Sequence, residues 1–112
     1  MNPAKSSSVT NFRLTNRAAE RRIHETAERT EYVVFGIHAL ERMEERGITD
    51  AQVYEVLRTG HVTEPPALTE LGEWKCKIVK QLRGGGREVG VITIILKNGK
   101  LFIKTVEWED VR

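Results

Sequence analysis

The chain has 112 residues, 39% of them hydrophobic and 30% charged, a length that allows one small globular domain but not two. Its net charge of +2 is too small to indicate a nucleic-acid or membrane partner by itself. A lone cysteine, Cys76, excludes an internal disulfide and a cysteine-based zinc site. No signal-peptide pattern and no apolar run of the roughly twenty residues that span a bilayer is present, so we expect a cytoplasmic protein.

The N-terminal part divides into two segments. Residues 1–12 are polar, include three consecutive serines and show no hydrophobic period, so we expect a flexible tail. Residues 13–31 are predicted to form an accessory helix, because alanines and Ile23 repeat at helical spacing between Thr15 and Thr30. A stripe made mostly of alanine buries little surface, so we expect this helix to dock on the domain or on a partner.

Residues 32–112 are expected to form a single α+β domain whose first half is mainly helical. The β-branched and aromatic run from Tyr32 to Phe35 predicts a short strand. The next segment, from about Ile37 to Arg46, predicts a helix that ends at Gly47. The residues that this helix is expected to bury are Leu40 and Met43.

The following helix has the clearest start in the sequence. Thr49 can cap it, and Gln52 three residues later can complete a capping box. The helix is predicted to end at Gly60 and to bury Val53, Val56 and Leu57. Residues 61–72 contain two adjacent prolines, which indicate a connecting loop with at most a short edge strand.

Three strands are predicted in the second half, at residues 73–82, at 88–97, and after the hairpin signal Asn98-Gly99. If Lys97 pairs with Lys100, the face predicted to be core carries Ile92, Ile94, Leu96, Leu101, Ile103 and Thr105. The face predicted to be open carries Thr93, Ile95, Phe102 and Lys104. The expected fold is α+β, with N-terminal helices packed on one face of a three- to four-stranded antiparallel sheet.

Charge is distributed unevenly along the chain. Residues 1–60 contain nine basic and nine acidic residues, whereas residues 73–104 contain eight basic and two acidic residues, a net +6. Basic side chains beside an exposed aromatic ring suit RNA, because phosphates bind the cations and bases stack on the ring. The alternative is a solvated face whose lysines protect strand edges from aggregation. The candidate nucleic-acid-binding residues are Lys75, Lys77, Lys80, Arg83, Phe102 and Lys104.

Three polar residues, His38, Arg42 and Arg46, are spaced four apart and therefore share one side of the predicted helix. Metal-independent RNA cleavage needs a general acid or base that titrates near neutrality, together with cations that stabilise the phosphorane. The histidine and the two arginines fit these roles. The alternative is an ordinary charged helix face on which the histidine only caps or packs.

One stretch resembles the opening motif of the domain-of-unknown-function 4258 family. It reads His38-Ala39-Leu40-Glu41-Arg42-Met43-Glu44-Glu45-Arg46-Gly47-Ile48-Thr49. Similarity continues in Gly72-Glu73-Trp74-Lys75-Cys76-Lys77, in the glycine turn with Arg87, and in Phe102-Ile103-Lys104-Thr105-Val106. The resemblance covers about residues 33–110 and leaves the N-terminal helix outside it.

The resemblance implies a fold related to the RelE and ParE-like toxins, often encoded in toxin–antitoxin or mobile-element loci and suspected to act on RNA. Carried over by position, it implies catalytic roles for His38, Arg42 and Arg46, with Arg87 and Thr105 as candidates on the sheet. The implied partners are RNA, including ribosome-bound RNA, and an antitoxin protein. No cofactor and no metal is expected.

Other interpretations stay open at this point. The same fold could bind nucleic acid or protein without catalysis, because no carboxylate is evident to orient His38. A homodimer through Ile95 and Phe102 is a third possibility. A metal at His24 and Glu28 lacks a third ligand, and the register of Cys76 indicates a core residue rather than a nucleophile.

Overall fold

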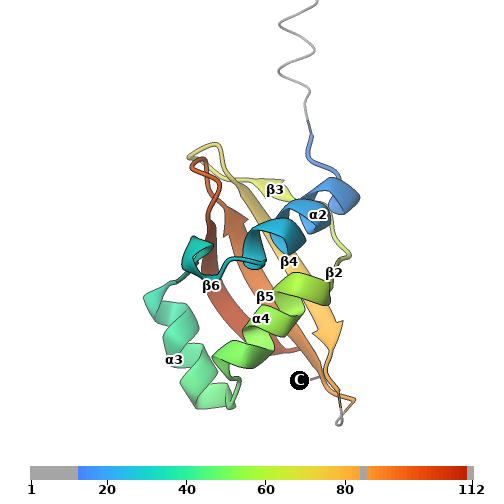
Figure 1. The fold of residues 1–112 in the computed structure, drawn as a ribbon, viewed down its shortest axis with the longest axis vertical. Coiled ribbons are helices and arrows are strands. Elements are labelled where there is room, and N and C mark those ends of the chain that lie inside the picture. Colours follow the sequence, from blue (N-terminus) through green and yellow to red (C-terminus); the bar gives the residue numbers. More distant parts are fainter. Residues whose placement is uncertain (1–12, 84–85, 111–112) are drawn as a thin grey trace, which may run out of the picture.

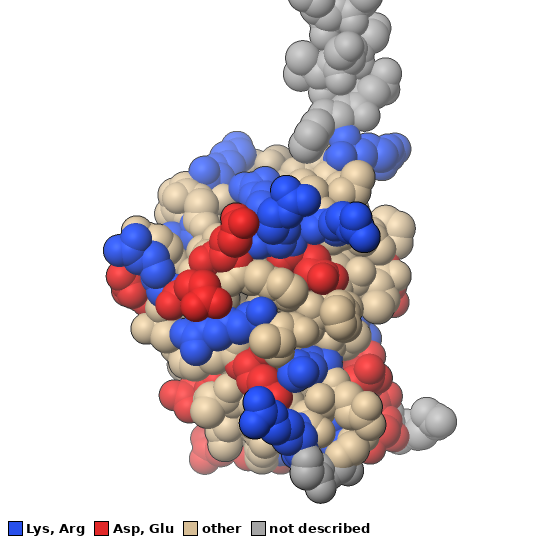
Figure 2. Space-filling view, turned by 45° about the vertical axis from the view of Figure 1, so that its right-hand side comes forward, with Lys and Arg blue, Asp and Glu red and all other residues tan. Residues whose placement is uncertain are grey.

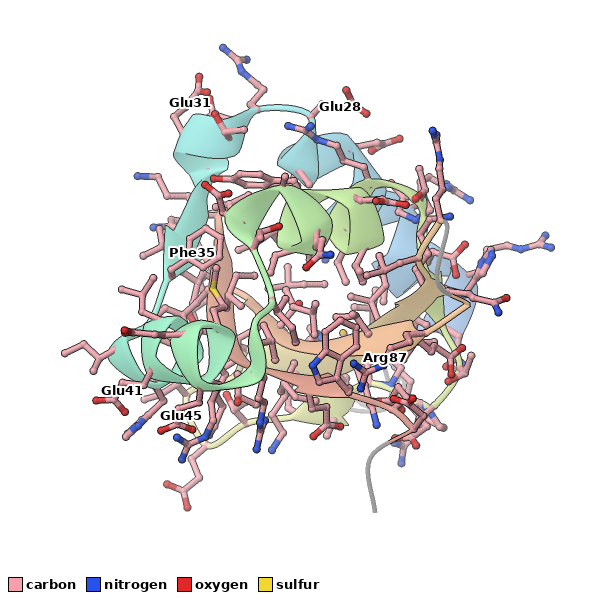
Figure 3. The ribbon with its side chains drawn as sticks, turned by 90° about the horizontal axis from the view of Figure 1, so that it is seen from below. Glu28, Glu31, Phe35, Glu41, Glu45 and Arg87 are labelled. Atoms are coloured by element: carbon pink, nitrogen blue, oxygen red, sulfur yellow. The ribbon has the colours of Figure 1, made fainter. Side chains whose placement is uncertain are left out.

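The structure is a computed structural model that describes residues 13–83 and 86–110. Helices α2 (Asn16–Ala27) and α4 (Asp50–Thr59) cover one face of a six-stranded sheet, and α3 (Ile37–Arg46) lies along its side (Figure 1). A view from below shows the same layers, and no helix of the described residues lies over the opposite face (Figure 3). The α+β class is confirmed, and the uncovered side of the sheet is named its open face.

The sheet is larger than expected and mixed rather than purely antiparallel. Its strands are β1 (Val33–Phe35), β2 (His61–Val62), β3 (Ala67–Leu68), β4 (Trp74–Gln81), β5 (Glu88–Ile95) and β6 (Leu101–Trp108). They run in the order β1-β6-β5-β4-β2, with β3 also paired to β4. The predicted antiparallel trio β4, β5 and β6 forms the centre, while β1 pairs parallel to β6. Strand β1 confirms the short strand predicted at Tyr32 to Phe35, and β2 and β3 are two-residue pieces within the predicted loop of residues 61–72, too short for a periodic sequence signal.

Local signals at the helix ends are confirmed. The Thr49 side chain accepts a hydrogen bond from the Gln52 backbone, and the Gln52 side chain accepts one from the Thr49 backbone, which completes the capping box of α4. Val53, Val56 and Leu57 are fully buried, as predicted. Helix α3 ends at Gly47, whose φ of +67° lies in the left-handed region that glycine tolerates best.

The accessory helix α2 is anchored on the domain. Ala19, Ile23 and Ala27 are fully buried, so the thin alanine stripe allows close packing rather than weak docking. His24 donates a hydrogen bond from Nε2 to the carbonyl of Gly60 at 2.8 Å, and Arg58 donates from Nε to the carbonyl of Ala27 at 2.8 Å. These contacts join α2 to the end of α4.

The predicted hairpin register is wrong by one residue next to the turn. Ile94 pairs with Phe102 and Ile95 with Leu101, because three residues rather than two form the loop, closed by a hydrogen bond from Leu96 N to Lys100 O. The predicted type I′ turn requires a positive φ at Asn98, and only glycines among the described residues have one. The single-residue shift places Thr93 and Ile95 in the core and Ile92 and Ile94 on the open face.

A second correction concerns Leu40. Its side chain was expected to be buried, but the residue is 51% exposed. Helix α3 covers the part of the β6 edge that the short strand β1 leaves unpaired, so its contact surface is narrow. Ala39 is fully buried there, and Met43 packs against the core. Within the described residues, no helix is long and apolar enough to span a membrane.

Candidate nucleic-acid interface

The open face carries a mixed row of side chains that crosses the whole sheet. Pairing aligns Lys75 of β4 with Ile94 of β5, Ile94 with Phe102 of β6, and Phe102 with Val34 of β1. Phe102 is half-buried because its ring lies against Gly36, where an added β-carbon would contact the ring at 2.5 Å. The row therefore places an apolar and aromatic strip beside a lysine on a surface that none of α2, α3 and α4 covers.

An irregularity in β6 adds two polar residues to this face. Thr93 pairs with Ile103 and Ile92 pairs with Thr105, so Lys104 is an extra residue opposite a continuous β5. Such a bulge breaks the usual alternation. Lys104 and Thr105 therefore both line the same hollow of the open face, which has a volume of about 320 Å³.

A second hollow of about 570 Å³ adjoins the first, and both are lined by Ala67, Lys75 and Lys104. The loop that carries β3 forms one wall and contributes Leu68 and Leu71, which are 62% and 71% exposed. Together the two hollows make a groove, called here the sheet groove. Within the described ranges, neither Lys75 nor Lys104 forms an ion pair, so both charges are available to an anion.

Lys77 lies next to the sheet groove, but its charge is already neutralised. Its Nζ lies 2.9 Å from Oε2 of Glu107 and 2.8 Å from Oε1 of Glu109. Burial favours the neutral amine, yet the hydrogen bonds donated to the two carboxylates outweigh this effect and raise the pKa of Lys77 above its usual value. Lys77 is therefore a weaker candidate for phosphate than Lys75 or Lys104.

The two carboxylates of this cluster differ in their protonation behaviour. The hydrogen bond from Lys77 lowers the pKa of Glu107, whereas burial, reinforced by the neighbouring Glu107, raises the pKa of Glu109. Neither residue was singled out by the sequence, because charges at the end of a strand carry no periodic signal. The sequence does hint at a close contact through Gly90, because a glycine inside a strand often marks a place where another group approaches the backbone. A side chain at position 90 would collide with Glu109.

The remaining candidate nucleic-acid residues lie elsewhere. Lys80 lies on the same, helix-covered side of β4 as Ile78 and lines a separate hollow at the sheet edge with His61 and Glu88. Arg83 is exposed in the turn that comes after β4. The open face thus brings together Lys75, Lys77, Phe102 and Lys104, and leaves Lys80 and Arg83 outside.

The candidate catalytic residues of α3 do not converge on one point. His38 is the second residue of the helix, its side chain is 79% exposed, and its Nδ1 lies 3.5 Å from Oε1 of Glu41, a carboxylate partner that was not evident from the sequence. Arg42 donates to Glu45 at 3.0 Å. Glu41 and Glu45 both project outward from α3 (Figure 3). At 1.5 Å per residue, about 12 Å of helix separates His38 from Arg46.

Arg46 and Arg87 are both tied to the end of β6. Arg46 donates from Nη1 to the carbonyl of Val106 at 2.6 Å, and its own carbonyl accepts a hydrogen bond from the indole of Trp108 at 2.7 Å. The guanidinium group of Arg87 stacks on the ring of the same Trp108, 3.8 Å from the ring centre (Figure 3). Arg87 also forms an ion pair with Asp110 at 3.2 Å. Thr105 lies apart from them in the sheet groove.

Cys76 is buried among core residues, and burial raises the pKa of its thiol to about 11. Such a thiol is a poor nucleophile at neutral pH.

Within the described parts of the chain, no group of three His, Cys, Asp or Glu side chains is arranged to hold a metal ion. His24 instead contacts the carbonyl of Gly60.

These observations define a small α+β domain with helices on one side of its sheet and, on the other, a partly apolar groove whose lining includes Lys75, Lys77 and Lys104 as well as Glu64, Glu70 and Glu73. The chain belongs to the family described as Domain of unknown function (DUF4258), whose model matches residues 35–108. The match includes α3, α4 and the central strands and excludes α2. No curated protein and no solved structure matches the chain.

Proposed function

We propose that this protein binds single-stranded RNA along the sheet groove. The observation that carries the proposal is the position of Lys75 and Lys104, which line both hollows of the groove and make no ion pair within the described ranges. The apolar strip of Ile94 and Phe102 lies beside Lys75 in the cross-strand row, and Lys104 follows Phe102 by two residues along β6. Cations that bind phosphates beside a surface on which bases stack are the usual elements of single-strand recognition.

The test is the affinity of the purified protein for a fluorescent single-stranded RNA, measured by anisotropy at several salt concentrations. Lys75→Gln with Lys104→Gln should weaken binding by about tenfold or more and should reduce the slope of log affinity against log salt by about 1.4, since each phosphate contact on a single strand contributes about 0.7. Lys80→Gln, on the other side of the sheet, is the matched control and should bind as the wild type does. Equal affinity of the double variant and the wild type would contradict the proposal.

Phe102 provides an independent test that does not depend on charge. Phe102→Leu keeps most of the packing volume against Gly36 but removes the aromatic face, and base stacking on such a face contributes about 1–3 kcal/mol. We expect RNA binding to weaken severalfold while the salt slope stays unchanged. An unchanged affinity would exclude stacking on this ring.

A second candidate function is metal-independent RNA cleavage with His38 as the general acid or base, as expected for a toxin-like protein. One observation favours it: Glu41 lies close enough to orient the imidazole. RNA incubated in EDTA with wild type and with His38→Ala tests it, with or without ribosomes. Cleavage by the wild type that the variant loses would support catalysis, and intact RNA in both would contradict it.

A further inference from the structure

Exposed arginines gather on the first half of α2 and just before it. Arg13, Arg17, Arg21 and Arg22 are all exposed, and none of them forms an ion pair with another residue of the described ranges. Arg13, Arg17 and Arg21 are spaced four apart, so the helical geometry aligns Arg17 and Arg21 along one side. Basic side chains cluster at the upper end of the molecule, where Figure 1 places α2 (Figure 2). These four residues are called here the arginine face.

The helix gains no stability from this arrangement. A helix N-terminus carries partial positive charge and favours acidic side chains, yet the first turn of α2 contains none and its second position is Arg17. Glu25 and Glu28 lie at the opposite, partly negative end. The charges at both ends of α2 therefore oppose the helix dipole.

Glu20, the acidic residue in this half of α2, does not neutralise the charges of the arginines. Glu20 accepts a hydrogen bond from the backbone of Val62 at 2.9 Å and faces His61 at 3.4 Å. Its carboxylate is thus directed to the junction between α2 and β2 rather than toward Arg17 or Arg21.

The arginines are not needed to hold the helix in place either. The opposite side of α2 is fully buried through Ala19, Ile23 and Ala27, and the contacts of His24 and Glu20 complete its docking. The helix is therefore a fixed platform that presents three guanidinium groups to solvent, with Arg13 just before it. An external polyanion would remove both the mutual repulsion and the conflict with the dipole.

We propose that the arginine face binds the phosphate backbone of RNA and is a second contact surface beside the sheet groove; this inference rests on the proposed RNA-binding function. RNA fits better than an anionic membrane, because a helix that lies in a membrane needs a free apolar side, and that of α2 is buried in the core. The surface lies outside the matched family region of residues 35–108.

The experiment uses the full chain and a fluorescent single-stranded RNA. Arg17→Gln with Arg21→Gln should weaken binding by about tenfold and reduce the salt slope by about 1.4. Arg17→Glu with Arg21→Glu should weaken it further, while the melting temperature stays equal or rises because the dipole now favours the charges. Arg29→Gln, beyond the end of the helix, removes one exposed charge as a control and should leave the affinity unchanged.

The outcomes separate this inference from the proposed function. If both arginine variants bind RNA as the wild type does while Lys75→Gln with Lys104→Gln weakens binding, the arginine face is not an RNA contact but the sheet groove is. If the wild type binds no RNA, both proposals fail. If the wild type binds vesicles that contain phosphatidylserine more tightly than RNA, and the arginine variants lose this binding, the assignment of RNA as the occupant is wrong.

Discussion

The carboxylate of Glu109 lies directly over the backbone of Gly90, so that a β-carbon at position 90 would overlap Oε2 of Glu109 and approach the side chain of Lys77. Gly90 is in the middle of β5, where glycine ordinarily weakens a strand. Its presence is explained by the cluster of Lys77, Glu107 and Glu109 that lies across it. This cluster borders the sheet groove, and its two carboxylates neutralise the charge of Lys77, one of the lysines that line the groove.

The first prediction is that Gly90→Ala lowers the free energy of unfolding by about 1–3 kcal/mol, the usual cost of inserting a methyl group into a packed site. Urea denaturation monitored by circular dichroism measures the change. In a Glu109→Ala background the same substitution should cost clearly less, because the colliding carboxylate is gone. An equal cost in both backgrounds would show that Glu109 does not restrict position 90.

The second prediction concerns the dependence of stability on pH. Lys77→Met removes the cation that Glu107 and Glu109 share and leaves the influence of Arg46 on Glu107, so the pKa of Glu109 should rise further above that of the unfolded chain. A raised carboxyl pKa contributes stability that is fully present below the unfolded pKa and is lost as pH rises through the folded pKa. The free energy of unfolding of the variant should therefore increase as the pH falls from 7 to about 4.3, near the unfolded glutamate pKa.

Denaturation curves across this range, for the wild type and for Lys77→Met, provide the measurement. Lys75→Met is the matched control, because Lys75 has no carboxylate partner in the described ranges and its loss should not change the pH profile. A Lys77→Met protein that becomes less stable as pH falls would contradict the interpretation of the cluster.

The third prediction is that Cys76 is unreactive in the folded protein. Burial raises the pKa of its thiol to about 11, so at pH 8 the reactive thiolate is scarce and the sulfur is shielded. Mass spectrometry after treatment with iodoacetamide should show little modification without denaturant and complete modification in concentrated urea. Rapid labelling of the folded protein would contradict a core position.

Much of the fold can be predicted from local rules in the sequence. The capping box at Thr49, the left-handed Gly47 and the alternation of β4 each depend on neighbouring residues, so a single sequence suffices to predict them. The face of β5 could not be predicted in the same way. It depends on whether the loop at Asn98 has two or three residues and on the bulge at Lys104, and a shift of one residue exchanges the two faces.

The candidate site was predictable in composition but not in arrangement. An excess of lysine in the strands was visible in the sequence, and Lys75 and Lys104 do share the sheet groove. The pairing of Lys77 with Glu107 and Glu109 depends on the register of three strands, which no local pattern encodes. The contact between Trp108 and the carbonyl of Arg46 likewise joins residues distant in the chain.

The most direct test of the central claim is an NMR titration of isotope-labelled protein with unlabelled single-stranded RNA. RNA binding in the sheet groove predicts the largest backbone amide shifts at Lys75, Ile94, Lys104 and Thr105, with small shifts at buried residues of α4 such as Val56. Shifts at the groove that the Lys75→Gln and Lys104→Gln double variant abolishes would support the account. Saturating RNA that leaves the groove amides unshifted would contradict it.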